Sequence, residues 1–255
     1  MKNIILSGCG GRMGRSVIEA VEASGVARIV AGVDVNAAAL GTVCSFPVYE
    51  NIVDFPGKAD VIIDFSHHSA LPSLTDYAVS HKTPLVVATT GHTDEERQMM
   101  VDAAEKTAIF FSRNMSIGIN LLIELCKKAA ATLGEDFDIE IIEKHHNKKL
   151  DAPSGTAMMI AEELRDVREG ETEFVYDRHS VRRERQTSEI GIHAIRGGTI
   201  VGEHDVIFAG NNEIVTLSHT ATSREVFANG ALKAALYIAD KSAGFYSMTD
   251  LINER

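Results

Sequence analysis

The sequence predicts an α/β protein in which a doubly wound parallel sheet is joined to a second α+β domain with an open mixed or antiparallel sheet. Three observations lead to this fold class. Apolar runs alternate with helical patterns up to about residue 116, a glycine-rich turn follows the first run, and three strand-like runs follow residue 187. A chain of 255 residues is long enough for two domains.

The first domain is predicted to begin with a strand, a turn and a helix. Residues 2–7 form an apolar run that stops at a glycine cluster, and Met13, Val17, Ile18 and Val21 follow at helical spacing. The later elements are predicted as strands at 27–33, 59–65, 84–89 and 108–111 and helices at 70–81 and 93–106. Such alternation is typical of a parallel sheet with helices on both faces.

The pattern changes after about residue 117. A helix at 117–133 leads into residues 138–143, where isoleucines alternate with acids as in a sheet with one solvated face. A helix is expected to end near Val167. Three β-like runs follow at 188–195, 199–208 and 213–220, and their succession predicts an open antiparallel sheet. A last helical pattern at 223–241 is expected to return to the first domain.

The glycine-rich turn predicts a bound dinucleotide. It reads Gly8-Cys9-Gly10-Gly11-Arg12-Met13-Gly14, follows a strand and opens a helix. Glycines let the backbone approach a pyrophosphate, which the helix N-terminus then binds. Asp34 lies 20 residues beyond Gly14, where an acid accepts a hydrogen bond from an adenosine ribose. The first domain is therefore predicted to be Rossmann-like.

Asp34 also bears on the choice of cofactor. A carboxylate accepts from a ribose 2′-OH but repels a 2′-phosphate, and the neighbours Val35 and Asn36 offer no compensating charge. NADH is therefore favoured over NADPH. Because Arg12 on the turn could still reach a 2′-phosphate, we expect the protein to use both.

A second candidate site lies at residues 143–157, which read EKHHNKKLDAPSGTA. Two histidines and two lysines precede a Pro-Ser-Gly-Thr step that is typical of a helix start, with proline at the first helical position. Free N–H groups and the helix dipole make such a start a candidate anion site. The alternative is a solvated basic loop in which the histidines are incidental.

Composition excludes several classes of function. The net charge of −11 argues against a nucleic-acid or anionic-membrane surface, and no apolar stretch approaches the roughly 18 residues that span a bilayer. The first residues lack the pattern of an export signal, and three scattered cysteines match no disulfide or metal spacing. We therefore expect a cytoplasmic protein. The basic run at 182–185 is interpreted as a solvated loop.

Together these motifs resemble those of the 4-hydroxy-tetrahydrodipicolinate reductase family, formerly called dihydrodipicolinate reductase, of lysine and diaminopimelate biosynthesis. The resemblance covers nearly the whole chain. Its most specific part is the His-His pair followed by a lysine and Asp-Ala-Pro-Ser-Gly-Thr-Ala within 143–157. The other matching motifs are 8–14, Asp64-Phe65-Ser66, 88–91, 114–120, 196–204 and 223–231.

The resemblance implies NAD(P)H-dependent reduction of 4-hydroxy-tetrahydrodipicolinate to tetrahydrodipicolinate with loss of water. Hydride would reach ring carbon C4, and the resulting enamine would be protonated at C3. His145 is implied as the acid/base group, and Lys149 as an assisting proton donor and carboxylate partner. The implied substrate-binding residues are His146, Ser154, Gly155, Thr156 and Thr90.

The resemblance also implies a cofactor site, a domain division and an assembly. Residues 1–116 and 226–255 would bind the dinucleotide, and residues 117–225 would bind substrate and form a homotetramer, with no metal. The implied cofactor residues are Gly8, Cys9, Gly10, Gly11, Arg12, Met13, Asp34, Phe65, Ala88, Thr89, Thr90, Ser112, Arg113, Asn114 and Met115.

Four positions depart from the family pattern. Ala88 replaces a glycine, Met115 an aromatic residue, Arg113 a small residue and Lys148 a histidine. None of these changes removes a proposed catalytic group. We expect them to affect affinity and cofactor preference more than the reaction.

Three other functions compete with the reductase. A metal-dependent hydrolase would use His145 and His146 with Asp151 or Glu143, but adjacent residues on a strand point to opposite faces. A non-catalytic NAD sensor would have no need for His145, Lys149 and the Ser-Gly-Thr turn. Another two-domain reductase that acts on a small acidic metabolite is the third.

Overall fold

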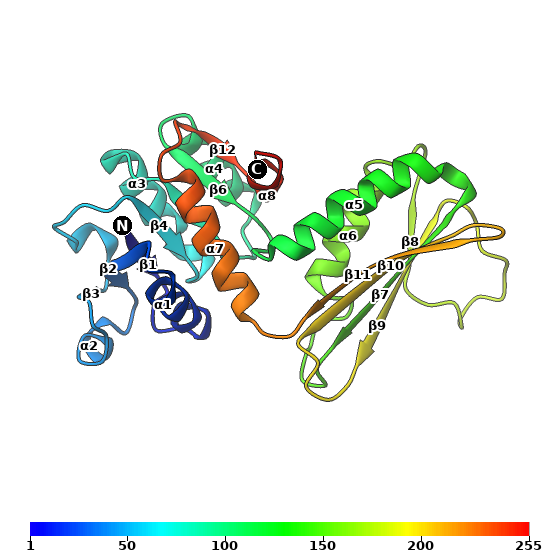
Figure 1. Cartoon of the computed structure of the whole chain (residues 1–255), viewed down its shortest axis with the longest axis horizontal. Coiled ribbons are helices and arrows are strands. Elements are labelled where there is room, and N and C mark those ends of the chain that lie inside the picture. The colour runs from blue at the N-terminus through cyan, green and yellow to red at the C-terminus, as the bar shows by residue number, and fades with distance from the viewer. Residues whose placement is uncertain (255) are drawn as a thin grey trace. The chain divides into compact units, whose positions relative to one another are not determined.

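The computed structural model describes residues 1–254, which form two compact units. The first unit comprises Met1–Ile117 with the C-terminal part of the chain from Arg224, and the second comprises Gly118–Ser223 (Figure 1). The first unit contains a parallel sheet with helices on both faces, and the second contains a mixed sheet. The predicted fold class is confirmed.

The sheet of the first unit has seven strands in the order β12-β6-β5-β4-β1-β2-β3, and all its pairs are parallel. Its strands are β1 (Lys2–Ser7), β2 (Ala27–Val33), β3 (Val48–Tyr49), β4 (Val61–Asp64), β5 (Leu85–Val87), β6 (Ala108–Phe111) and β12 (Gly244–Tyr246). The strand order reverses beside β1, between β4 and β2. Open α/β sheets bind ligands at such a point. The sequence did not predict β3 and β12, which are too short to show a periodicity.

Helices cover both faces of this sheet because successive strand residues point to opposite sides. Ile4 and Leu6 pack with α1, α7 and α8, whereas Ile5 packs with α3 and α4. The helical elements are α1 (Arg12–Ser24), α2 (Ala37–Leu40), η1 (Ile52–Asp54), η2 (His68–Ala70), α3 (Leu71–His81), α4 (Asp94–Ala104), α7 (Glu225–Ile238) and α8 (Met248–Asn253). The short α2 and α8 were not predicted.

The second unit has a five-stranded sheet in the order β11-β10-β7-β9-β8. Its elements are α5 (Ile117–Leu133), η3 (Gly134–Asp136), β7 (Asp138–His145), α6 (Gly155–Arg165), β8 (Glu173–Val175), β9 (Glu189–Arg196), β10 (Gly202–Ala209) and β11 (Ile214–Ala221). The helices α5 and α6 pack against one face of the sheet, where Ile139 and Ile141 of β7 contribute to the core (Figure 1).

The prediction of a consecutive antiparallel sheet is wrong for the first of its three strands. β7 lies between β9 and β10. It pairs parallel with β9 and antiparallel with β10. The chain leaves β7, passes through α6 and the edge strand β8, and then forms β9, and such a long crossover is what parallel pairing requires. As a result, Arg196 is the register partner of His145, and His204 that of Glu143.

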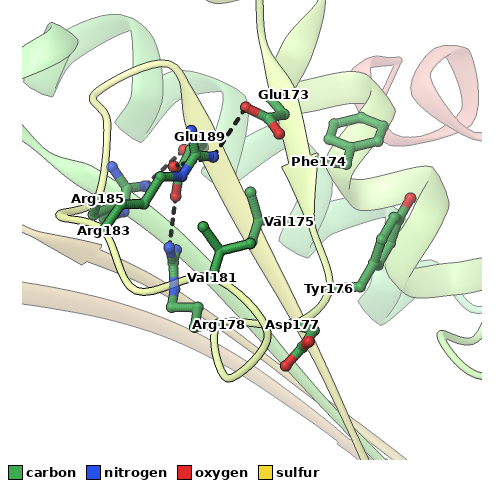
Figure 2. Close-up of a pocket in the computed structure, with 10 residues that line it drawn as sticks. All are labelled: Glu173, Phe174, Val175, Tyr176, Asp177, Arg178, Val181, Arg183, Arg185 and Glu189. Carbon is green, nitrogen blue, oxygen red and sulfur yellow. Dashed lines mark hydrogen bonds and ion pairs between the residues drawn. The ribbon is translucent and has the colours of Figure 1, made fainter.

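A loop at 176–188 lies beside β8, and three of its arginines form ion pairs with acids. Arg178 and Arg183 form ion pairs with the buried Glu189 at 2.5 and 3.1 Å around a cavity of about 250 Å³ (Figure 2). Arg185 pairs with acids of β7, and its side chain is only 17% exposed. The prediction of a solvated loop is therefore wrong for Arg185, because these acids neutralise its charge.

Candidate active site

The predicted cofactor residues follow five neighbouring strands of the first unit. They come after β6, β5, β4, β1 and β2, in the order in which these strands lie in the sheet. Because all five strands are parallel, their carboxyl ends share one edge. At about 4.8 Å per strand this edge extends over roughly 19 Å, a length suited to an extended dinucleotide.

The glycine turn is shaped by close backbone contacts. Gly8 has a φ of +78°, and a Cβ there would lie 2.5 Å from the Phe65 carbonyl oxygen. A Cβ on Gly14 would lie 2.3 Å from the Gly8 carbonyl oxygen. Neither position accepts a side chain, so the turn and the start of α1 require glycine.

Asp34, at the end of β2, contacts the glycine-rich turn. Its carboxylate accepts hydrogen bonds from the Gly10 N–H at 2.9 Å and from the Asn36 N–H at 3.0 Å. Both bonds fix the carboxylate at the mouth of a cavity of about 570 Å³, a size typical of ligand pockets. The cavity is lined by Ser7, Gly8, Gly10, Gly11, Val33, Asp34, Val35, Asn36, Glu50, Asn51, Ile52, Phe65, Ser66, His67, Ser69, Ala70, Ser73 and Leu74.

This cavity fits the adenosine half of a dinucleotide. Apolar side chains such as Ile52 and Leu74 offer a surface for a base, and the glycine backbone is open for phosphates. Among residues 1–254, those that line it include two carboxylates, Asp34 and Glu50, and no lysine or arginine. Its charge therefore opposes a 2′-phosphate.

Several predicted cofactor residues lie outside this cavity. Cys9 is buried in the core, and Met13 packs against that core. Arg12 is exposed at the start of α1. The sequence could not separate these residues from the glycines, because a motif of consecutive positions does not show which side chains turn inward.

The ends of β5 and β6 are built around buried polar contacts. Thr89 donates a hydrogen bond to the fully buried Asp64 at 2.7 Å, and Ser112 donates to the Asn114 carbonyl at 2.7 Å. Thr90 and Arg113 are exposed. The departures Ala88 and Met115 are buried, with 8% and 2% of their surface exposed, so they pack in the core.

In the second unit, His145 is held by Glu143 on the same face of β7. The two residues are separated by one position, and their side chains meet at 2.6 Å between His145 Nδ1 and Glu143 Oε2. Since a carboxylate can only accept, Nδ1 carries a proton and Nε2 is the free ring nitrogen. Gly202 leaves room there, because a Cβ at this position would lie 3.1 Å from Nε2.

Glu143 itself is completely buried and has two further partners. Arg196 donates two hydrogen bonds to its two oxygens, each at 2.7 Å, and the Ser154 N–H donates to Oε1 at 3.0 Å. Arg196 also donates to the Asp151 carbonyl at 2.5 Å. These bonds fix the loop between β7 and α6.

The predicted anion site lies at the start of α6. Ser154 is its N-cap and accepts from the Ala157 N–H at 3.1 Å, while Gly155 and Thr156 form the first turn. Pro153 precedes the cap, so the prediction of proline at the first helical position is wrong by two residues. Ser154 Oγ also lies 3.2 Å from Nε2 of the buried His204, and the His204 ring contacts the His145 ring edge to face.

Lys149 lies in the same loop as the His-His pair. The Nζ of Lys149 is 2.8 Å from the exposed Asp151 carboxylate. Its backbone N–H donates a hydrogen bond to the His146 backbone carbonyl at 3.1 Å. His146 is half-buried. The second unit thus contains His145, His146, Lys149 and the Ser-Gly-Thr turn within one segment between β7 and α6.

The surroundings shift the pKa values of these groups in different directions. Burial lowers the pKa of His145, Glu143 offsets part of this effect, and the cations Lys149 and Arg196 add to the lowering. Burial alone would raise the pKa of Glu143, but hydrogen bonds from Arg196, His145 and Ser154 outweigh it and lower that pKa. His145 therefore faces a carboxylate whose charged form is favoured.

The sequence reasoning missed three members of this group. Glu143 was considered only as a metal ligand, and Arg196 and His204 were given no role. The alternation of β7 was the available signal for Glu143, because residues two apart share a face. Arg196 and His204, which come from β9 and β10, are the first and last residues of the matching motif 196–204, but that motif did not show that they approach Glu143 and Ser154.

Two classes of feature are not found in the part of the chain that the structure describes. Residues 1–254 contain no group of three His, Cys, Asp or Glu side chains placed to hold a metal ion. None of the helices formed by these residues is long and apolar enough to cross a membrane.

Comparison with known proteins identifies the family. The model of the dihydrodipicolinate reductase N-terminus matches residues 2–115, and that of the C-terminus matches residues 118–252. The chain belongs to the dihydrodipicolinate reductase family. It is an oxidoreductase, and the resemblance inferred from its motifs is confirmed.

Relatives of this reductase family match the chain over its full length. The 4-hydroxy-tetrahydrodipicolinate reductase of Caldanaerobacter subterraneus subsp. tengcongensis is 50% identical over 100% of this chain and 99% of its own. That of Clostridium novyi is 46% identical over 100% of both chains. The dipicolinate-bound dihydrodipicolinate reductase from Paenisporosarcina sp. TG-14 is 26% identical with a TM-score of 0.80, and the match covers 97% of each chain.

Proposed function

We propose that this protein reduces 4-hydroxy-tetrahydrodipicolinate to tetrahydrodipicolinate with loss of water, in lysine and diaminopimelate biosynthesis. The observation that carries the proposal is His145, whose Nδ1 is bound to Glu143 and whose Nε2 is free, next to the N-terminus of α6. The relatives named 4-hydroxy-tetrahydrodipicolinate reductase and the dipicolinate-bound structure support this substrate class.

Binding of a dicarboxylate would use the positive groups of the second unit. The first turn of α6, where the Gly155 backbone hydrogen-bonds the Asp151 carboxylate, directs the positive end of the helix dipole toward our candidate position for one substrate carboxylate. Lys149 and His146 are our candidates for the other. Thr90 of the first unit is a further proposed substrate contact.

The reaction adds one hydride and one proton and releases one water. A nicotinamide cofactor held by the first unit would supply the hydride for ring carbon C4. His145 delivers the proton to C3 through Nε2, with Lys149 assisting. A nearby dianion raises the pKa of His145 and so offsets the lowering by burial.

The cofactor is proposed to bind in the first unit, with NADH preferred over NADPH. Gly8, Gly10, Gly11, Asp34 and Phe65 all line the cavity described above. The carboxylates of Asp34 and Glu50 disfavour a 2′-phosphate, and the lining that the structure describes contains no lysine or arginine to offset them. We further propose a cytoplasmic homotetramer that forms through residues 117–225.

One coupled assay tests the proposed function. The purified protein is mixed with the condensation product of pyruvate and aspartate semialdehyde, and oxidation of NADH and of NADPH is followed separately. We expect oxidation with both and a larger kcat/KM with NADH. Absence of oxidation with either cofactor refutes the assignment, and equal values refute the proposed preference.

A further inference from the structure

Glu143 joins parts of the site that belong to separate elements. It lies on β7 with 0% of its surface exposed, and its two oxygens accept four hydrogen bonds. The donors are His145 of β7, Arg196 of β9 and the N–H of Ser154, the N-cap of α6. One carboxylate therefore contacts the acid/base residue, a fixed cation and the first residue of the anion site.

Burying a carboxylate lowers the stability of the fold through its lost hydration unless its charge is compensated. The bidentate Arg196 pair and the Ser154 N–H provide the compensation. If His145 needed only a hydrogen-bond acceptor at Nδ1, a backbone carbonyl would suffice. An ionised group with its own arginine instead fixes both the tautomer of the ring and the charge beside it.

We propose that Glu143 is a positioning residue for the reduction and that Arg196 balances its effect on His145. Glu143 holds the proton on Nδ1, directs Nε2 away from itself, and keeps the start of α6 at a fixed place relative to the ring. Arg196 offsets the negative charge of Glu143, so that Glu143 does not raise the pKa of His145 so far that the imidazolium cannot release its proton. This inference rests on the acid/base role proposed for His145.

The charges around His145 predict opposite effects for the two residues. Glu143 of β7 favours the imidazolium, whereas Arg196 of β9 and Lys149 of the loop disfavour it. His204 of β10 is the remaining titratable neighbour, and burial lowers its pKa to about 4, so it is neutral at pH 7. Glu143→Gln should therefore lower the pKa of His145, and Arg196→Gln should raise it.

Steady-state kinetics over a pH range test the proposal in the full chain. For a general acid, kcat/KM falls as pH rises through its pKa. We expect this decline at lower pH in Glu143→Gln and at higher pH in Arg196→Gln. Loss of a partner that orients a functional histidine should reduce kcat about 10- to 100-fold, with a smaller change in KM. Glu143→Asp keeps the charge. It should therefore recover part of kcat, and its kcat/KM should decline at the same pH as in the wild type.

Glu163→Gln is the matched control, because it removes a carboxylate from α6 that pairs with Lys127 instead. Its kinetics should equal those of the wild type. The affinity for NADH and the urea midpoint of each variant show whether the fold is retained. Wild-type kcat with an unmoved pH profile in Glu143→Gln overturns the proposal, as does an increase in KM alone.

Nuclear magnetic resonance of protein labelled with ¹⁵N-histidine gives a readout that does not need turnover. The neutral wild-type His145 should carry its proton on Nδ1, and direct titration should show the opposite pKa changes in Glu143→Gln and Arg196→Gln. A proton on Nε2, or pKa changes in the same direction, overturns the proposal. Failure of the coupled assay in the wild type would instead refute the proposed function.

Discussion

At the scale of single residues, His145 has one ring nitrogen left for chemistry because Glu143 occupies the other. Replacing His145 with glutamine should lower kcat by roughly 10²- to 10⁴-fold, the usual contribution of one positioned acid/base group. The affinity for NADH should not change, since the predicted cofactor residues lie in the other unit. Single-turnover kinetics and a fluorescence titration with NADH measure the two quantities. A variant with full activity would contradict the proposed role.

Val35 is the residue best placed to change the cofactor preference. It lines the cavity beside Asp34, and 83% of its surface is exposed, so a longer side chain meets no steric barrier. Val35→Arg should raise the ratio of kcat/KM for NADPH to that for NADH about tenfold, which is roughly 1.4 kcal/mol in favour of the 2′-phosphate. Val26→Arg adds the same charge at an exposed site that lies outside the cavity and should leave the ratio unchanged.

At the scale of elements, Ser154 at the start of α6 makes two kinds of contact. Ser154 caps the helix and also contacts the buried His204. Ser154→Ala removes a cap, worth about 1 kcal/mol, and leaves a buried ring nitrogen unpartnered, which costs about 1 kcal/mol more. We therefore expect a loss of about 2 kcal/mol in the free energy of unfolding, together with a raised KM for substrate.

Ser247→Ala is the matched control for this prediction. Ser247 caps α8, where its hydroxyl accepts from the Asp250 N–H. Its loss should cost about 1 kcal/mol without an effect on KM. Urea denaturation and steady-state kinetics of both variants separate capping from the effect on the site. Equal costs and equal KM values would show that the contact between Ser154 and His204 has no consequence.

The elements also show what the sequence could predict. Long periodic segments such as α1 and the run that became β7 were predicted because their apolar residues repeat at the helical or strand period. The position of β7 between β9 and β10 was not, because strand order depends on contacts between distant residues. For the same reason the motifs proposed roles for His145 and Ser154, whereas the sheet was needed to show that Arg196 and His204, at the ends of the motif 196–204, contact Glu143 and Ser154.

At the scale of the whole molecule, charge is distributed unevenly. The chain has a formal net charge of −11, yet Lys149, Arg196 and the N-terminus of α6 all lie within the second unit near His145. We expect the proposed dicarboxylate to rely on local attraction to these groups against the overall negative field, although Lys149 and Arg196 also pair with Asp151 and Glu143. Increasing ionic strength screens both, but it screens the longer-range repulsion more strongly. The overall acidity therefore opposes binding of the proposed anionic substrate.

Stability should fall on mild acidification, chiefly through His204. Its pKa is lowered from 6.5 to about 4, first by burial and then by His145, with His219 and Lys149 contributing and Glu143 opposing. Below pH 6.5 the unfolded chain binds a proton that the folded chain does not, so stability present above this pH is lost progressively down to about 4. The loss in the free energy of unfolding should reach roughly 2.5 kcal/mol between pH 7.5 and 4.5.

Urea denaturation should show a smaller loss in His204→Gln than in the wild type. His179→Gln, which removes an exposed imidazole, is the control for the substitution. Equal losses in the wild type and His204→Gln would show that His204 is not the group responsible.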